Sequence, residues 1–145
     1  MKTIKGPGIY LAQFATDEAP FNQLDTLAQW VADRGFKGVQ IPTWDTRIFN
    51  LKLAAESQSY CDEITGMLAS KGLVVTELAS HITGQLVAVH PAHDQIMDSF
   101  APAEVRGNPA ARQKWAVEQM GYCARASKNL GVDRHVSFTG SLLWP

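Results

Sequence analysis

Three polar residues, Glu77, Ser80 and His81, follow directly on a short apolar run, Leu73–Thr76. The run comes just after the helix-ending pair Lys71-Gly72 and is rich in β-branched residues, so it predicts a buried strand. α/β folds hold their sites at the carboxyl ends of strands. Glu, Ser and His at such an exit can bind hydroxyl groups or transfer protons. The stretch therefore predicts a functional site, and His81 is the residue that packing alone explains least.

The elements around this stretch repeat one pattern. Short apolar runs predict three further strands, over Gly8–Phe14, Phe36–Ile41 and Val132–Thr139. Amphipathic patterns predict helices over Phe21–Arg34, over much of Leu51–Ser70 with a break near Ser57–Ser59, and from Asn108 to about Leu130. The order βαβαβαβ predicts an α/β fold with a parallel sheet and right-handed crossovers.

The segment 80–107 has no clean periodicity and is interrupted by Gly and Pro. A connection of that length inside a compact domain is usually functional, so we expect a binding loop or lid after the third strand. Thr83–Val89 would begin the part that covers the substrate.

Polar and aromatic residues gather at the predicted strand exits. They are Gln13, Gln40, Trp44, Asp45, Glu77, Ser80, His81, Ser137 and Thr139. Converging exits form a pocket, and Trp and His beside hydroxyls and amides suit a polyol such as a sugar. For Gln13, Gln40 and Ser137 the alternative of a strand-end group bonded to backbone stays open. His135 is predicted to be structural, at the end of its strand away from the pocket.

A metal site is a weaker interpretation. His90, His93 and Asp94 in HPAHD could bind Zn, Mn or Co together with His81. They lie in an irregular segment without a strand-borne carboxylate, so solvated histidines are favoured and no metal ligand is assigned. His90 follows an apolar run and is expected to point inward more than His93.

Composition excludes several classes of function. The 145 residues carry a net charge of −1, with 46% apolar and 19% charged residues, and no basic cluster that would favour nucleic acid. No apolar run is long enough to span a bilayer, and the N-terminus does not read as a signal peptide. The turn 15–18 lacks Gly and carries two acids, which disfavours a nucleotide phosphate site. Cys61 and Cys123 read as core residues in a reducing compartment, so we expect a cytoplasmic protein.

Several stretches resemble the bacterial sugar phosphate isomerase/epimerase family of xylose-isomerase-like barrels. They are 38–45 (GVQIPTWD), 51–57 (LKLAAES), 77–81 (ELASH), 84–91 (GQLVAVHP), 100–109 (FAPAEVRGNP) and 138–145 (FTGSLLWP). The resemblance implies a (β/α)8 TIM barrel with a divalent metal (Mn, Co, Zn or Mg), in which carboxylates move a proton next to a carbonyl. It implies a substrate-side wall made by Trp44, His81, Gln85 and His90, with His81 as a catalytic residue.

Proteins of this family run to about twice this length, typical of a complete barrel. The chain, residues 1–145, therefore resembles the N-terminal half, about four βα units, and most metal ligands are expected outside it. The expected partners are a small sugar and whatever closes the barrel: a missing C-terminal half, a second copy or a separate chain. A fragment is favoured, because Trp144-Pro145 falls inside a strand-exit loop. A sugar dehydratase or lyase, and a non-catalytic half that only assembles with a partner, remain alternatives.

Overall fold

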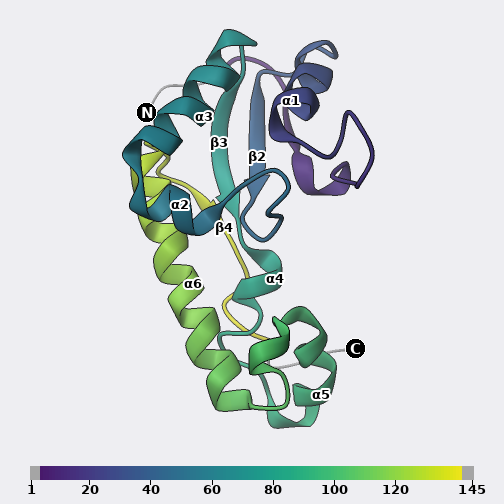
Figure 1. Ribbon diagram of the computed structural model, residues 1–145, viewed down its shortest axis with the longest axis vertical. Helices are drawn as coiled ribbons and strands as arrows, with labels where there is room; N and C mark the ends of the chain where they lie inside the picture. Colours follow the sequence, from purple (N-terminus) through teal and green to yellow (C-terminus); the bar gives the residue numbers. More distant parts are fainter. Residues whose placement is uncertain (1–3, 142–145) are drawn as a thin grey trace.

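A computed structural model describes residues 4–141 of the protein and shows one sheet of four parallel strands (Figure 1). The strands are β1 (Gly8–Tyr10), β2 (Gly38–Pro42), β3 (Val74–Ala79) and β4 (His135–Val136). Each strand pairs with the next one along the chain, in the order β1-β2-β3-β4. The predicted α/β class and all-parallel sheet are therefore confirmed. Closure into a barrel is a finer statement and stays a prediction.

The two outer strands are shorter than predicted. The chain leaves the sheet after Tyr10, and the remainder of the expected first strand turns into the 3-10 helix η1 (Leu11–Gln13). β4 keeps only two of the eight residues of the run 132–139. Both are edge strands with a single partner, and β4 pairs only with the carboxyl end of β3, so few ladder bonds are available to extend either one.

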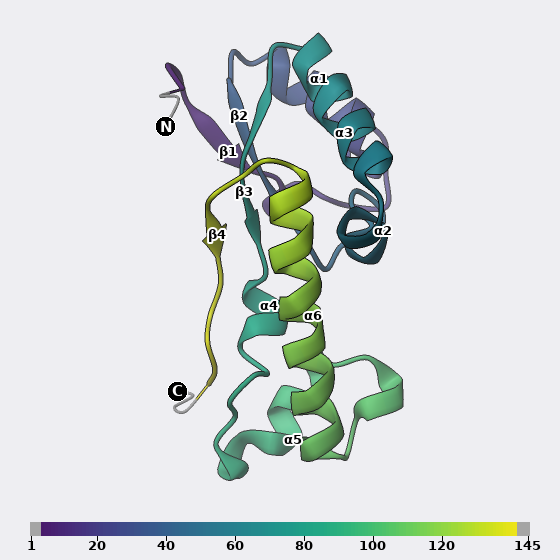
Figure 2. The ribbon, with the colours of Figure 1, turned by 90° about the vertical axis from the view of Figure 1, so that its left-hand side faces the viewer.

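Helices cover one face of this sheet (Figure 2). The longer ones are α1 (Leu24–Ala32), α2 (Leu51–Glu56), α3 (Gln58–Ser70) and α6 (Pro109–Asn129). The predicted break lies at Ser57, whose extended backbone ends α2 and whose hydroxyl accepts from the Tyr60 N–H at the start of α3. The start of α6 is confirmed as well, since the Asn108 side chain accepts the Ala111 N–H at 3.1 Å.

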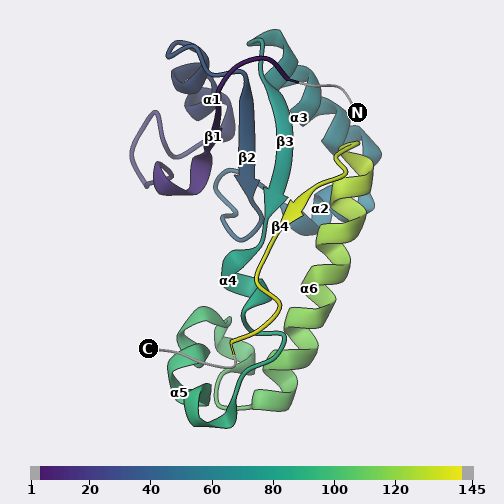
Figure 3. The same cartoon turned by 180° about the vertical axis from the view of Figure 1, so that it is seen from behind.

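The main core lies between the sheet and the helices. Val39, Ile41 and Leu78 point into it from β2 and β3 and are fully buried. Because side chains alternate along a strand, Gln40 and Glu77 point to the opposite face. None of the described helices packs on that opposite face, which Figure 3 shows from behind. We call it the open face.

The segment 80–107 is not the irregular loop that the sequence predicts. It folds into short turns of helix: α4 (His81–Gly84), η2 (Pro91–His93), α5 (Asp94–Met97), η3 (Asp98–Phe100) and η4 (Ala103–Val105). With α6 they enclose a second, smaller core of Leu86, Met97, Ala101 and Ala116. Elements of three or four residues are too short to show a helical period, which is why the sequence pattern missed them.

A buried arginine fastens this second core to α6. Arg112 is 1% exposed, and its guanidinium bonds Asp94 and, at 2.6 Å, Asp98. The pKa of Asp98 is lowered by the hydrogen bond from the Gly107 N–H and then by Arg112. The ion pairs therefore hold α5 and the following turn against α6, below the carboxyl ends of the strands (Figure 1).

Candidate functional site

Four rings meet on the open face at the carboxyl ends of the strands. Tyr10 ends β1, whereas Trp44, His81 and Phe138 follow β2, β3 and β4, and we call these four residues the aromatic cluster. Ring centroids are 5.9 Å apart for Tyr10 and His81, 6.3 Å for Trp44 and His81, and 5.2 Å for His81 and Phe138, each pair edge to face. His81 therefore lies at the centre of the cluster.

Strand alternation brings these rings together. At the end of β3, Glu77 and His81 point to the open face, whereas Leu78 and Ser80 between them point toward the helices. Trp44 and Phe138 lie at the same offset from β2 and β4, whereas Tyr10 is paired with Gln40 inside the sheet. Each of the four neighbouring parallel strands therefore supplies one ring. Trp44 and His81, which the sequence predicted, are both in the cluster.

A polar groove continues from Tyr10 along the open face. It has a volume of about 370 Å³ and is lined by Tyr10, Gln40, Thr76, Glu77 and Arg134, among others. Gln40 donates from its amide to the Glu77 carboxylate. Gln40 lies opposite both Tyr10 and Glu77 in the sheet, and the register shift beside it inserts Thr76 as an extra residue. Glu77, the acid that the sequence predicted at the end of β3, thus faces this groove.

Burial raises the pKa of Tyr10 to about 12. Its phenol is therefore protonated at neutral pH and can donate a hydrogen bond, while the Glu77 carboxylate can only accept when ionised. A donor and an acceptor beside a cluster of edge-to-face rings can bind the hydroxyls and the apolar face of a small polyol.

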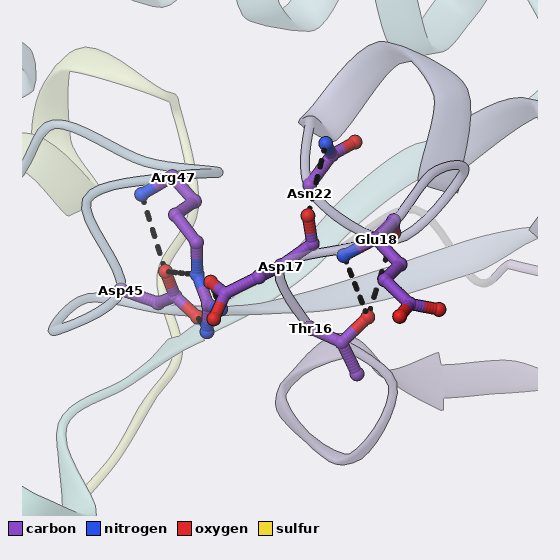
Figure 4. Close-up of polar contacts among 6 residues, drawn as sticks. All are labelled: Thr16, Asp17, Glu18, Asn22, Asp45 and Arg47. Atoms are coloured by element: carbon purple, nitrogen blue, oxygen red, sulfur yellow. Dashed lines mark hydrogen bonds and ion pairs between the residues drawn. The ribbon is translucent and has the colours of Figure 1, made fainter.

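A salt bridge between two exit loops holds the loop that carries Trp44 (Figure 4). The Arg47 guanidinium bonds Asp45 at 2.7 Å and reaches across to Asp17, in the β1–α1 loop, at 2.6 Å. These hydrogen bonds lower the pKa of Asp45. Asp45, a predicted strand-exit residue, is therefore engaged by Arg47 and serves the position of its neighbour Trp44.

The Asp17 loop has its own local order. The Thr16 hydroxyl accepts the Glu18 N–H at 3.3 Å, and the Asn22 amide donates to the Asp17 carbonyl at 3.4 Å (Figure 4). The turn is held by side-chain-to-backbone bonds of the kind that Thr and Asn residues form in loops.

Gln85 and His90 do not join the aromatic cluster. Gln85 is 4% exposed and lies just beyond α4, outside the set of residues that line the groove. His90 is exposed, contrary to the inward orientation predicted for it, and its Nδ1 accepts the Ala92 N–H at 3.2 Å. The apolar run before it packs into the second core, so the chain turns outward at His90 to begin a 3-10 helix.

Two further expectations are wrong in position. Ser80 does not reach the open face: it is fully buried, and its hydroxyl lies 3.6 Å from the Met120 sulfur on α6. His135 does not lie at the far end of the sheet, because the stagger of β4 places it opposite Leu78 near the end of β3. Its Nε2 is 2.6 Å from the Ser80 Oγ.

This bond makes His135 a link between the two strands. The Ser80 hydroxyl also donates to the Ser137 Oγ at 2.9 Å, so one buried hydroxyl connects both ends of the short β4 to β3. Burial, and then the charge of His81, lower the pKa of His135. The predicted structural role of His135 agrees with this contact.

Sequence reasoning missed Tyr10 as a site residue and did not single out Phe138. Tyr10 was treated as the body of a longer first strand, although it is the residue at which that strand ends. Phe138 follows β4 by two residues, the same offset at which Trp44 follows β2 and His81 follows β3. That common offset is the signal that would have found it.

Within residues 4–141, no three His, Cys, Asp or Glu side chains converge closely enough to hold a metal ion. None of the helices in that range combines the length and apolar character required to cross a membrane. Comparison with known protein families gave no match, and comparison with curated protein sequences gave none either.

Proposed function

We propose that this chain supplies the substrate-side wall of a sugar, or sugar phosphate, isomerase or epimerase that moves a proton next to a carbonyl. The observation that carries the proposal is the aromatic cluster at the carboxyl ends of four parallel strands, next to a groove with a carboxylate. This is the end of the sheet at which barrels hold their sites. The fold that the proposal requires is a (β/α)8 barrel of which these strands are four.

The rings suit a sugar because a sugar carries both C–H faces and hydroxyls. Trp44 and Phe138 offer apolar surfaces on either side of His81, whose ring nitrogens can bond a hydroxyl or carbonyl oxygen. Tyr10 donates from its protonated phenol at the mouth of the groove. The cluster would thus orient a small polyol over Glu77.

Glu77 is the group on this chain that can accept a proton from a carbon. Its carboxylate faces the groove and is held by Gln40, which fixes its direction without neutralising its charge. Enolisation needs a base within hydrogen-bond reach of the carbon proton. A dehydratase or lyase would remove the same proton from carbon. What happens next to the resulting enediol therefore distinguishes these reaction classes from an isomerase.

A divalent metal belongs to the proposal, but the described residues do not fit a complete site for it. Glu77 and His81 together are short of the three or more protein ligands that such centres use. We therefore derive no step through the metal, and we propose that the residues that bind it come from the strands that close the barrel.

A non-catalytic assembly half is the second candidate, and the open face favours it. Among the described strands, β1 and β4 are unpaired at their outer edges, and no second layer formed by residues 4–141 covers the open face. Such edges and faces normally pair with further strands. The sequence that follows Pro145, or the mass of the natural protein, distinguishes a fragment from a half barrel.

Solvent exchange tests the proposed chemistry. The protein, alone and with a chain that supplies the closing strands, is incubated in D2O with ketoses, aldoses and their phosphates plus Mn, Co, Zn or Mg. We expect deuterium at the carbon next to the carbonyl, by NMR, only in the closed barrel. His81→Ala and Glu77→Gln should lower the rate at least tenfold, and Trp30→Phe, a ring on α1 outside the cluster, should not. Exchange that is indifferent to both site variants refutes the proposal.

A further inference from the structure

A second cavity opens beside the candidate site, and its lining residues come from the β2–α2 loop, α4, α6 and the segment 99–106. Figure 1 shows where these elements lie. We call it the side cavity. Its volume is about 430 Å³, which is the size of a small-molecule site. Its main side chains are Trp44, Lys52, Phe100, Arg106, Trp115 and Gln119. Of the described residues, none lines both this cavity and the groove that contains Glu77.

The charge in the side cavity is entirely positive. Among residues 4–141, Lys52 and Arg106 line it and no carboxylate does. The nearby Asp98 is already engaged, because it accepts the Gly107 N–H at 2.8 Å and Arg112 at 2.6 Å. A negatively charged ligand would therefore meet two cations in the cavity wall, and the nearby acid is Asp98, whose charge also acts on Arg106 from outside the lining.

Arg106 is oriented for this role. Its Nε donates to the Ala101 carbonyl at 2.8 Å, which fixes the plane of the guanidinium and leaves its two terminal nitrogens for other acceptors. A guanidinium fork of this kind binds carboxylate or phosphate oxygens in pairs. Lys52 adds a mobile point charge from the first turn of α2.

Flat apolar walls accompany the cations. Phe100 and Trp115 pack against the second core and line the cavity, and Trp44, a member of the aromatic cluster, lines it too. The amide of Gln119 adds a polar group. An aromatic wall with a few convergent polar groups is the usual composition of a small-ligand site.

We infer that the side cavity binds a small organic oxyanion, a carboxylate or a phosphate ester, whose charged end lies at Arg106 and Lys52 and whose flat part lies against Trp115. The inference is independent of the proposed isomerase activity. Because Trp44 also contacts His81 at a centroid distance of 6.3 Å, a ligand in the side cavity would be felt at the aromatic cluster.

The test is a titration of the purified protein followed by the indole N–H signals in ¹⁵N-edited NMR. The signals are assigned with single Trp→Phe variants, and the probes are benzoate, phenyl phosphate, inorganic phosphate and the neutral benzyl alcohol at constant ionic strength. Benzoate and phenyl phosphate should move the Trp44 and Trp115 signals to saturation. Trp30 on α1 is the internal control for a cation beside an indole, because the Arg34 guanidinium carbon lies 3.8 Å from its ring centroid. Its N–H signal should not shift.

Two variants assign the charge. Lys52→Gln and Arg106→Gln should each weaken the aromatic anions about tenfold, the value of one lost charge-assisted contact, whereas Lys128→Gln at the other end of α6 should not. Lys52 is exposed, so its variant keeps the test valid if Arg106→Gln loosens the loop. Stronger binding of one probe identifies the carboxylate or the phosphate.

The inference is overturned if neither aromatic anion gives a saturable shift. It is also overturned if benzyl alcohol binds as tightly as benzoate, since that would be an apolar pocket without an anion site. If both Lys52→Gln and Arg106→Gln bind the aromatic anions as tightly as the wild type, these two cations are not the source of the affinity. Solvent exchange on sugars has no bearing on any of these outcomes.

Discussion

Gly84, the last residue of α4, has no room for a side chain. A Cβ at this position would lie closer than 3.0 Å to both the Ser137 Oγ and the Phe138 carbonyl oxygen, and 3.2 Å from the Phe138 carbonyl carbon. Gly84 itself is buried and has an ordinary helical backbone, so Ala is excluded by its neighbours and not by its backbone angles. The close approach is what lets the chain after β4 bring Phe138 to His81.

The expected effect of Gly84→Ala follows from two opposing terms. Ala is favoured over Gly in a helix by about 0.5–1 kcal/mol. Against this, the Phe138 backbone must move by about 1 Å to restore normal contact, and overpacking of this kind costs about 1–3 kcal/mol. Because the obstructing atoms include backbone, the upper part of that range applies. We expect a net loss of about 1–2 kcal/mol, or about 3 to 8 °C in Tm.

Gly66→Ala is the matched control. Gly66 lies within α3, is exposed, and has no atom within 4 Å of an added Cβ. The same chemical change should therefore stabilise the protein by about 0.5–1 kcal/mol.

Both variants are measured by urea unfolding followed by circular dichroism, with the His81 ring signals in NMR as a local readout. Gly84→Ala should also shift those ring signals, because Phe138 moves, and Gly66→Ala should leave them unchanged. A Gly84→Ala protein as stable as Gly66→Ala would mean that the strand exits are not packed as described.

The remaining predictions concern protonation. In a spectrophotometric titration, Tyr10 should ionise near pH 12, and Tyr10→Phe should remove that late step while the burial-raised Tyr60 titration stays. Since the folded pKa of Tyr10 is raised, its contribution to stability is complete below about pH 10 and is lost as pH rises toward 12; a step at the ordinary pKa would contradict its burial. Arg47→Gln should raise the pKa of Asp45 in a ¹³C carboxyl titration, because the guanidinium bond that lowers it is lost. In the wild type the Asp45 contribution is present above about pH 4 and is lost as pH falls through the depressed folded pKa, so an unchanged Asp45 titration in Arg47→Gln would rule out the loop bridge.

The parts of the fold that the sequence predicted well are those with long or local signals. Both ends of the helix from Pro109 to Asn129 have signals that are visible in the sequence. Asn108 caps its start, and Gly131, with a left-handed φ of 70°, follows its end. Ser57 marks its own helix break for the same reason, because a side-chain cap acts over three residues. Trp44 and His81 were predicted because they come shortly after apolar strand runs, and that signal is equally local.

The parts that sequence reasoning missed depend on register and on long-range packing. The stagger that lifts His135 to the level of Leu78 is a property of the strand pair and has no local sequence signal. Ser80 was predicted to face the site, but the direction of its side chain depends on the residue at which β3 ends, which the sequence does not fix. The second core depends on Arg112 meeting two acids from another turn, a pairing that no periodicity shows.

α6 takes part in both cores. Ala116 near its start packs into the second core, whereas Ala126 near its end packs into the main one. A helix of 21 residues is about 30 Å long, so one continuous ladder of backbone hydrogen bonds joins the two regions. The second core has few buried side chains of its own, so its unfolding is coupled to that of the main core through this helix. Unfolding of the first turns of α6 would disrupt the side cavity and leave the sheet intact. Loss of the contacts between α6 and the sheet would destabilise both the main core and the second core.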